Sequence, residues 1–152
     1  MEFNCAIVYP KCLSVIKLES RKARFFETGG PLVGCVKDGI LLIIDATGPG
    51  PKALLEPFSV TIDGAYAQRF CDSLNFKSQG QIDYVGDWHK HPGVSLRPSS
   101  HDIVAMRTMA NFEFSPTKHP VSLIYRRWPQ SFVVYVWDGS GSLSKIPSKI
   151  GR

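Results

Sequence analysis

Apolar residues occur along this chain in short runs, and the spacing within each run predicts a strand or a helix. Residues 4–10 form an apolar run that ends in a proline, which predicts a first strand. From Leu13 onward, apolar and small residues recur at helical spacing, which predicts a helix that ends near Arg24. Residues 31–50 then predict two strands joined by the turn residues Lys37, Asp38 and Gly39.

The second half of the chain continues this mixture of strands and helices. Within residues 61–76, four apolar positions lie four apart and share one helical face: Ile62, Tyr66, Phe70 and Leu74. A further helix is predicted over residues 98–112, with Ile103, Met106 and Ala110 facing inward. Strands are predicted over residues 81–88, 121–127, 131–139 and 142–146. This order predicts an α/β (α+β) fold, a curved mixed β-sheet flanked by helices, in a single domain over residues 1–152.

The composition is that of a globular protein, with 43% hydrophobic and 20% charged residues among 152. No apolar run approaches the roughly 18 residues that cross a bilayer, and the N-terminus lacks the charge order of a signal peptide. We therefore expect a cytoplasmic protein without a membrane partner. Its four cysteines show no paired spacing, so we expect reduced thiols, with Cys12 the most exposed.

The net charge of +5 includes two basic clusters, one within residues 17–24 and one at Arg126 and Arg127. Such clusters either attract an acidic partner or form an ordinary solvated face. No run of like charges is long enough for a nucleic-acid tail, so we expect no nucleic acid as a partner. Nothing in the sequence indicates an oligomeric state.

The stretch GDWHKHPGVSLRPSSHD, residues 86–102, concentrates three histidines, two aspartates and three serines. His89 and His91 are two apart at the end of a predicted strand, so both side chains face the same way. Two imidazoles and the carboxylate of Asp102 leave one position of a tetrahedral zinc site open for water, as catalytic sites require. The alternative is local, because Ser99 followed by Asp102 also fits the capping pattern of a helix start.

The residues HKHPGVSLRPSSHD match the H-x-H-P-x5-P-S-x2-D signature of the JAB/JAMM (MPN-type) zinc metallopeptidases, and the chain resembles that family. The resemblance implies a cytidine-deaminase-like fold and one Zn²⁺ per chain, bound by His89, His91 and Asp102. It also implies that Ser99 stabilises the oxyanion of the tetrahedral intermediate. His101 occupies a variable position of the signature and is left outside the expected metal shell.

A second element of the same resemblance lies upstream. The residues FFETGGPLVGCV, 25–36, resemble the glutamate element of the family, which implies Glu27 as the general base. The paired glycines Gly29 and Gly30 either let backbone approach a substrate closely or form a turn.

Members of this family typically cut amide or isopeptide bonds at the C-terminus of ubiquitin or a ubiquitin-like modifier. By this resemblance we expect a zinc-dependent isopeptidase that acts on such a modifier, or on a protein conjugated by a ubiquitin-transfer-like system. The details ETGG and GDWHKHP are most similar to bacterial JAB proteins, which include the deconjugase of the CBASS anti-phage system. This narrower resemblance implies a role in antiviral defence.

Three other functions are compatible with the motif. RadC-like proteins of DNA metabolism share a similar spacing, but they usually carry Asn between the histidines, where this chain has Lys90. A small-peptide or sulfur-carrier-processing hydrolase would use the same site. A non-catalytic MPN scaffold is disfavoured, because scaffold members commonly lose metal ligands and every ligand is intact here.

Overall fold

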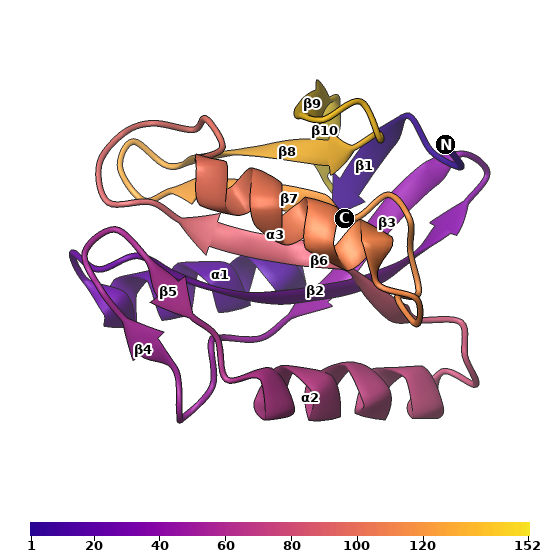
Figure 1. Ribbon diagram of the computed structural model, residues 1–152, viewed down its shortest axis with the longest axis horizontal. Helices are drawn as coiled ribbons and strands as arrows, with labels where there is room; N and C mark the ends of the chain where they lie inside the picture. Colours follow the sequence, from indigo (N-terminus) through magenta and orange to yellow (C-terminus); the bar gives the residue numbers. More distant parts are fainter.

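The computed structural model describes residues 1–152, and its centre is a curved eight-stranded mixed β-sheet (Figure 1). The strands are β1 (Cys5–Val8), β2 (Thr28–Lys37), β3 (Ile40–Ala46), β6 (Asp83–Lys90), β7 (Val121–Arg126), β8 (Ser131–Trp137), β9 (Leu143–Ile146) and β10 (Ser148–Ile150). Their order across the sheet is β10-β1-β3-β2-β6-β7-β8-β9. Because β9 and β10 follow each other in the chain yet lie at opposite ends of this order, the sheet curls until it is nearly closed. The predicted fold class is confirmed.

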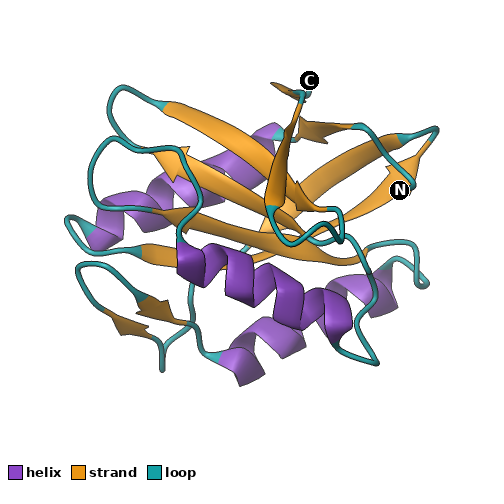
Figure 2. Ribbon diagram, turned by 45° about the horizontal axis from the view of Figure 1, so that its top comes forward, coloured by secondary structure: helices purple, strands orange, loops and turns teal.

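Three helices flank the sheet: α1 (Pro10–Ala23), α2 (Gly64–Lys77) and α3 (Ser100–Asn111). In Figure 2, α3 lies in front of the sheet and α1 lies behind it. α1 packs on β2 and β3, whereas α3 packs on β7 and β8. A separate hairpin of β4 (Leu54–Leu55) and β5 (Val60–Thr61) lies between β3 and α2 in the chain. None of the helices is both long and apolar enough to cross a membrane.

α1 begins three residues earlier than its spacing predicted, and this changes which residues face the core. Pro10 is its first residue, where a missing backbone N–H costs nothing. The residues of α1 that are buried are Cys12, Leu13, Ile16, Ser20 and Ala23. The expectation that Cys12 is the most exposed cysteine is therefore wrong, because its side chain is fully buried and burial raises the pKa of its thiol to about 12. All four cysteines are free, and Cys5 and Cys35 are the partly exposed ones.

The other predicted elements are confirmed, with small shifts at their ends. Asp38 and Gly39 both have positive φ, 52° and 76°, as the two-residue hairpin turn predicted for an Asp-Gly pair requires. The sequence did not reveal the β4–β5 hairpin or the edge strand β10, because each of these strands is only two or three residues long. That residues 1–152 form one domain stays a prediction.

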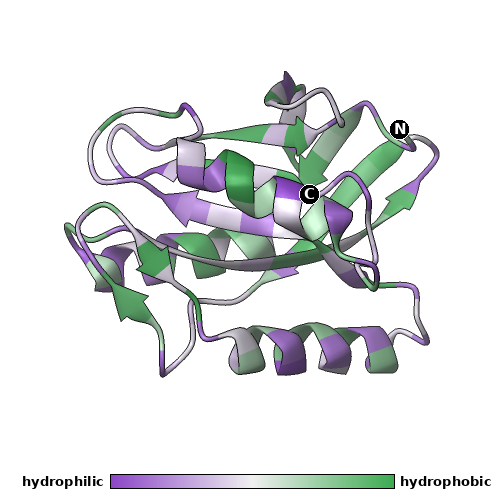
Figure 3. Ribbon diagram, in the orientation of Figure 1, coloured by the Kyte–Doolittle hydropathy of each residue, from purple (hydrophilic) through white to green (hydrophobic).

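β6 is the strand that positions the predicted site. It pairs antiparallel with β2 on one side and parallel with β7 on the other, so it lies inside the sheet. Trp88 is fully buried in the main core, and its indole Nε1 donates a hydrogen bond of 2.9 Å to the carbonyl oxygen of Thr47. The C-terminal end of β6, at the left of Figure 3, is hydrophilic. The polar residues of the site therefore lie at the end of a strand that is anchored in the core.

Candidate metal centre

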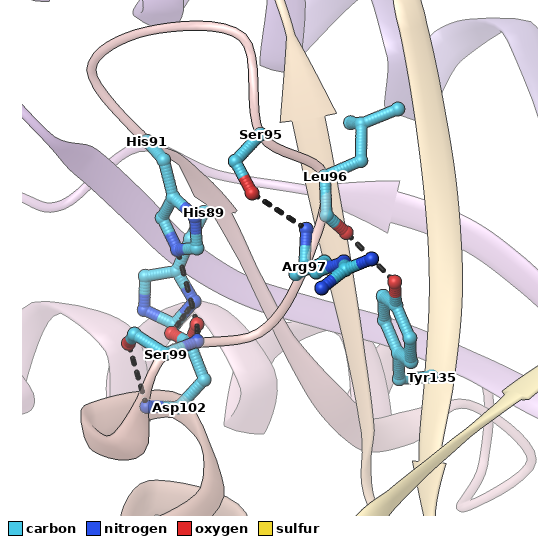
Figure 4. Close-up of polar contacts among 8 residues, drawn as sticks. All are labelled: His89, His91, Ser95, Leu96, Arg97, Ser99, Asp102 and Tyr135. Atoms are coloured by element: carbon cyan, nitrogen blue, oxygen red, sulfur yellow. Dashed lines mark hydrogen bonds and ion pairs between the residues drawn. The ribbon is translucent and has the colours of Figure 1, made fainter.

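The predicted metal ligands come from two elements that meet at one end of the sheet. His89 lies inside β6, which extends to Lys90, rather than just after the strand as predicted; His91 follows it. Asp102 lies in the first turn of α3. Both imidazoles turn to the α3 face, as their spacing of two predicts, and meet the carboxylate of Asp102 (Figure 4). The side chains of these three residues are 9%, 11% and 3% exposed, so water has little access to them.

The two imidazoles present ring nitrogens that have no hydrogen-bond partner. His89 Nδ1 lies 3.4 Å from Asp102 Oδ1, and His91 Nε2 lies 3.0 Å from Asp102 Oδ2. Although these distances are short, neither nitrogen makes a hydrogen bond, and both are buried. Ligand atoms around one tetrahedral zinc ion are about 3.3 Å apart, so the observed separations resemble those around a shared cation. Two buried, unpartnered ring nitrogens beside a carboxylate fit a divalent metal, because a metal would satisfy all of them.

The three side chains are not arranged as the coordination sphere of a bound metal ion. No group of three or more His, Cys, Asp or Glu side chains in residues 1–152 has the geometry of a bound metal. The imidazoles rest against the carboxylate itself. The backbone therefore brings the donors together, and binding of a cation between them requires side-chain rotation.

The charge states of Asp102 and His89 suit metal binding, whereas His91 must lose a proton more readily held than usual before it can bind a cation. Burial alone would raise the pKa of Asp102, but His91, His89 and the backbone N–H of Ser99 outweigh it and hold the pKa at about 2. Asp102 is therefore an anion at neutral pH. Burial lowers the pKa of His89, which favours the neutral imidazole that metals bind. Burial also opposes protonation of His91, but the carboxylates of Asp102 and Glu27 outweigh it, so the pKa of His91 is raised.

Ser99 and Asp102 form the helix cap that their spacing predicts. Ser99 Oγ accepts a hydrogen bond of 3.2 Å from the backbone N–H of Asp102, and Asp102 Oδ2 accepts one of 2.6 Å from the backbone N–H of Ser99. The cap uses a lone pair of Ser99 Oγ and leaves its O–H proton for another acceptor. It also leaves Asp102 Oδ1 without a hydrogen bond. Capping and a role in the site are therefore compatible, although the sequence presented them as alternatives.

Glu27 lies directly before β2, across from the histidines. Thr28 pairs with Lys90, so Glu27, one residue earlier, faces His91, one residue later. The backbone N–H of Glu27 donates a hydrogen bond of 3.0 Å to the carbonyl oxygen of Glu56 in the β4–β5 hairpin. The antiparallel register thus brings the predicted base to the predicted ligands.

The environment of Glu27 raises the pKa of its carboxyl. The residue is buried, and burial is the largest cause; the negative charge of Asp102 adds to it, whereas His91 and His101 act in the opposite direction. A carboxyl whose pKa is raised beside a metal site suits a general base. His101 is exposed and lies outside the expected metal shell, but its positive charge acts to lower the pKa of Glu27.

Lys90, between the two histidines, is a feature of this site that the sequence analysis missed. Its side chain points to the opposite face of β6, toward α1, and the residue is 3% exposed. Nζ donates hydrogen bonds to the carbonyl oxygens of Arg24 at 2.5 Å and Ser20 at 3.4 Å, at the C-terminal end of α1. The negative end of the helix dipole stabilises a cation there. The sequence did contain a signal for the direction of this side chain. Because side chains alternate along a strand, a residue between two histidines that face the same way faces the other way.

Gly29 and Gly30 lie inside β2 rather than in a turn, and the protein's own backbone approaches them closely. A Cβ on Gly29 would lie 2.4 Å from the carbonyl oxygen of Trp88. A Cβ on Gly30 would lie 2.1 Å from the carbonyl oxygen of Thr47. The turn expected as one alternative for these glycines is therefore wrong, and their small size allows close packing around Trp88.

The loop of residues 91–99, which joins the candidate ligands, is held by two side chains of the sheet. Tyr135 of β8 donates a hydrogen bond of 2.8 Å from its hydroxyl to the carbonyl oxygen of Leu96 (Figure 4). Arg126 of β7 donates one of 3.2 Å to the carbonyl oxygen of Val94. These contacts limit how far Ser99 and Asp102 can move relative to the histidines.

Comparison with protein families identifies the fold and the motif together. Residues 11–137 match the family described as prokaryotic homologs of the JAB domain. The chain belongs to the prokaryotic JAB-domain family. The matched range contains all five residues that the JAB resemblance implied for the site: Glu27, His89, His91, Ser99 and Asp102.

Curated relatives of this JAB-domain chain have names that refer to peptide-bond chemistry. The "Probable metalloprotease y4qB" of Sinorhizobium fredii is 28% identical over 116 residues, which are 74% of this chain and 70% of the relative. A "CD-NTase/cGAS isopeptidase" of Escherichia coli is 30% identical over 92 residues, 59% of each chain. A protein of the same name from Enterobacter hormaechei is 32% identical over 108 residues, 70% of this chain and 58% of the relative. The matches thus span little more than half of the two isopeptidases' own lengths.

A solved structure shares the overall fold of this chain. The solution structure of protein DSY2949 from Desulfitobacterium hafniense superimposes with a TM-score of 0.69 at 15% sequence identity. The superposition covers 97% of this chain and 93% of that protein. The shared arrangement therefore extends over nearly all of both chains.

Proposed function

We propose that this JAB-domain protein is a zinc-dependent isopeptidase that hydrolyses the (iso)peptide bond at the C-terminus of a ubiquitin-like modifier, or of a protein conjugated by a ubiquitin-transfer-like system. The observation that carries the proposal is that the buried ring nitrogens of His89 and His91, which make no hydrogen bond, converge on the carboxylate of Asp102. The proposal includes one Zn²⁺ per chain, a cytoplasmic location and a single domain over residues 1–152.

His89, His91 and Asp102 hold the zinc ion in this proposal. Bound there, Zn²⁺ supplies a Lewis acid that polarises the scissile carbonyl and makes water a nucleophile near neutral pH. His89 is ready to bind as a neutral imidazole, because burial lowers its pKa. Asp102 is ready to bind as an anion, because its pKa is about 2.

Glu27 acts as the general base and then as the general acid. Its carboxylate accepts a proton from the attacking water and passes it to the leaving amine. The raised pKa of Glu27, caused mainly by burial, brings proton uptake closer to neutral pH than in an exposed glutamate. The hydrogen bond from its backbone N–H to Glu56 keeps the segment that carries this carboxyl in place.

Ser99 donates its hydroxyl proton to the oxyanion that forms when water attacks the carbonyl. The helix cap fixes Ser99 Oγ against the N–H of Asp102 and leaves the O–H available. A donor that is already oriented loses little free energy to reorganisation during the reaction. Removal of one such donor typically costs about 10²–10³ in turnover.

The relatives support a protein substrate rather than a small molecule. Two of them are named CD-NTase/cGAS isopeptidases, and an isopeptidase cuts a bond between protein chains. A glycine-ended modifier tail is an extended strand, which suits docking against β-structure such as the β4–β5 hairpin beside Glu27. The role in bacterial antiviral defence that the sequence resemblance implies is part of this proposal.

The test is cleavage of a ubiquitin-like protein fused through its C-terminal glycine to a reporter. The zinc-loaded wild type is compared with Glu27→Ala, with and without a chelator, and zinc content is measured for each protein. We expect Glu27→Ala to keep its zinc and lose cleavage, because it removes a proton acceptor and no ligand. Glu113→Ala is the matched control, since the exposed Glu113 lies after the C-terminal end of α3 and outside the candidate site.

Ligand variants provide a readout that does not depend on activity. His89→Ala and Asp102→Ala should each bind less zinc and unfold more readily, because metal-binding free energy is lost with the ligand. Unchanged zinc content in both variants would remove these residues from the metal site. If zinc-loaded wild type cleaves short peptides and not the modifier fusion, the function is that of a small-peptide hydrolase instead.

A further inference from the structure

Five exposed residues form what we call the Arg–aromatic patch: Arg21, Arg24, Phe25, Arg127 and Trp128. They come from the C-terminal end of α1 and from the β7–β8 turn, which both lie at the left in Figure 1, as does the end of β6. Phe25 is 88% exposed and Trp128 is 83% exposed. Large aromatic side chains that are almost fully in water are unfavourable unless another surface covers them.

The two halves of the patch meet over the end of the sheet. Arg21 and Arg127 both act on Tyr125: burial raises the pKa of its hydroxyl, and the two guanidinium charges oppose that rise. Lys90 of β6 pairs with Tyr125 of β7, two residues before Arg127, and its Nζ donates a hydrogen bond to the carbonyl oxygen of Arg24. Segments about 100 residues apart in the sequence thus place their positive charges around the same buried side chains.

No carboxylate within the protein neutralises these arginines. The Lys and Arg ion pairs of the structure are Lys11 with Asp45 and Lys22 with Glu19. The three guanidinium groups of the patch therefore stand without a charged partner, in a protein whose net charge is +5. Exposed arginine and aromatic side chains together are the residues most enriched at the energetic centres of protein interfaces.

We infer that the Arg–aromatic patch binds an acidic surface of the protein substrate, an assignment that rests on the isopeptidase function proposed above. The patch lies on the α1 side of the sheet, whereas His89, His91 and Asp102 lie on the α3 side, and the end of β6 separates them. An extended tail in the site does not reach the patch, but a folded domain attached to that tail does. The substrate is therefore held at two places.

The arrangement favours a protein over a nucleic acid. Proteins that bind single-stranded nucleic acid use a positive groove that follows the phosphate backbone, with aromatic residues at intervals along it. Here the charges gather at one end of the sheet, and an exposed apolar side chain stands on each segment. Acidic side chains among apolar ones on a folded partner match this pattern in charge and in hydrophobicity.

The test measures binding without catalysis, so that it is independent of whether the site cleaves anything. The probe is a fluorescein-labelled peptide of alternating Glu and Leu residues, and its counterpart has Gln in place of Glu. Anisotropy at about 0.15 M ionic strength, where exposed charges are screened beyond roughly 8 Å, gives the affinity of each peptide. A labelled oligothymidylate serves as the nucleic-acid probe.

The decisive variants reverse or remove the patch charges. Arg21→Glu with Arg127→Glu should weaken binding of the Glu peptide about tenfold or more, as loss of interface arginines typically does. The double variant Arg21→Gln with Arg127→Gln should weaken binding of the Glu peptide less. It also avoids a negative charge beside the negative C-terminal end of the α1 dipole, which Glu at residue 21 would introduce. Lys145→Glu with Lys149→Glu is the matched control, since these exposed lysines lie on β9 and β10 and the change in net charge is the same.

The outcomes separate the alternatives. The inference stands if the Glu peptide binds more tightly than both other probes and only the patch variants lose it. It is overturned if the control variant loses as much, because net charge then explains the binding, or if the Gln peptide binds equally well. Tighter binding of the oligothymidylate, lost in the patch variants, would assign the surface to nucleic acid instead. A protein that binds as expected but cleaves no fusion would contradict the proposed function alone; the patch would then remain a binding surface for acidic, partly apolar partners that are not substrates.

Discussion

Lys90 Nζ lies 2.5 Å from the carbonyl oxygen of Arg24, and this contact joins the strand that carries His89 and leads into His91 to the helix that leads to Glu27. Arg24 ends α1 with φ of 56°, and only two residues separate it from Glu27. A displacement of this contact would therefore shift Glu27 relative to His89 and His91. The relative positions of these three residues depend on one buried side chain that points to the opposite face of β6.

Replacement of Lys90 by Met keeps an unbranched side chain and removes the charge and both hydrogen bonds. We expect a loss of about 1–3 kcal/mol in the free energy of unfolding, because buried carbonyl oxygens are left without donors. Turnover should fall while zinc content stays near that of wild type. Chemical denaturation, zinc analysis and steady-state kinetics check this, and an unchanged kcat in a destabilised protein would limit Lys90 to a structural role.

Two substitutions at Ser99 distinguish the cap from the chemistry. Ser99→Ala removes the hydroxyl and the cap, which should cost about 1 kcal/mol of stability, whereas Gly at an N-cap costs only a few tenths. If the hydroxyl acts in the reaction, Ser99→Ala and Ser99→Gly should lose turnover equally, by roughly 10²–10³. Thermal unfolding and kcat measured on both proteins give the answer. A kcat loss confined to the Ala variant would mean that the cap alone matters.

Gly30→Ala tests the close packing beside Trp88. The added Cβ would meet the backbone carbonyl oxygens of Thr47 at 2.1 Å and Gly48 at 2.9 Å, so the segment that follows β3 must move away from β2. We expect a destabilisation of about 1–3 kcal/mol, the usual cost of overpacking. Gly64→Ala is the control, because nothing lies within 4 Å of that Cβ at the start of α2. Equal stability of the two variants, measured by denaturation, would contradict the close approach seen here.

Asp138 should make stability depend on pH in the acid range. Its carboxylate accepts hydrogen bonds from the hydroxyls of Ser140 and Ser144 and from the backbone N–H of Ser140, and these hold its pKa at about 2 instead of the usual 3.8. Because the folded-state pKa is depressed, the stabilisation is present above pH 3.8 and is lost as the pH falls toward about 2. Asp138→Asn should therefore have a lower Tm than wild type at neutral pH.

The difference in Tm between Asp138→Asn and wild type is the quantity to follow. It should shrink progressively as the pH is lowered from 3.8 toward about 2, because the wild-type carboxylate becomes protonated. Melting curves at a series of pH values measure it. A difference that stays constant over this range would show that the hydrogen bonds at Asp138 do not favour the charged form.

Much of this site depends on spacing that the sequence shows directly. His89 and His91 face the same way because side chains alternate along a strand. Ser99 and Asp102 cap α3 because a Ser followed by an acid three residues later satisfies the free backbone N–H groups of a helix start. The hairpin at Asp38 and Gly39 follows from the left-handed backbone that this turn needs. Each of these features is decided within a few residues.

The tertiary structure decided what depends on residues far apart in the chain. The antiparallel register of β2 on β6 places Glu27 across from His91, and the early start of α1 buries Cys12. Lys90 contacts Arg24 because its side chain points away from the histidine face of β6, to the side where the C-terminal end of α1 lies. Strand register and helix docking depend on which apolar surfaces of distant segments pack against each other. The spacing of residues within one segment carries no information about its packing partner. The motif therefore came from the sequence, whereas the position of Glu27 opposite the histidines and the Arg–aromatic patch came from the fold.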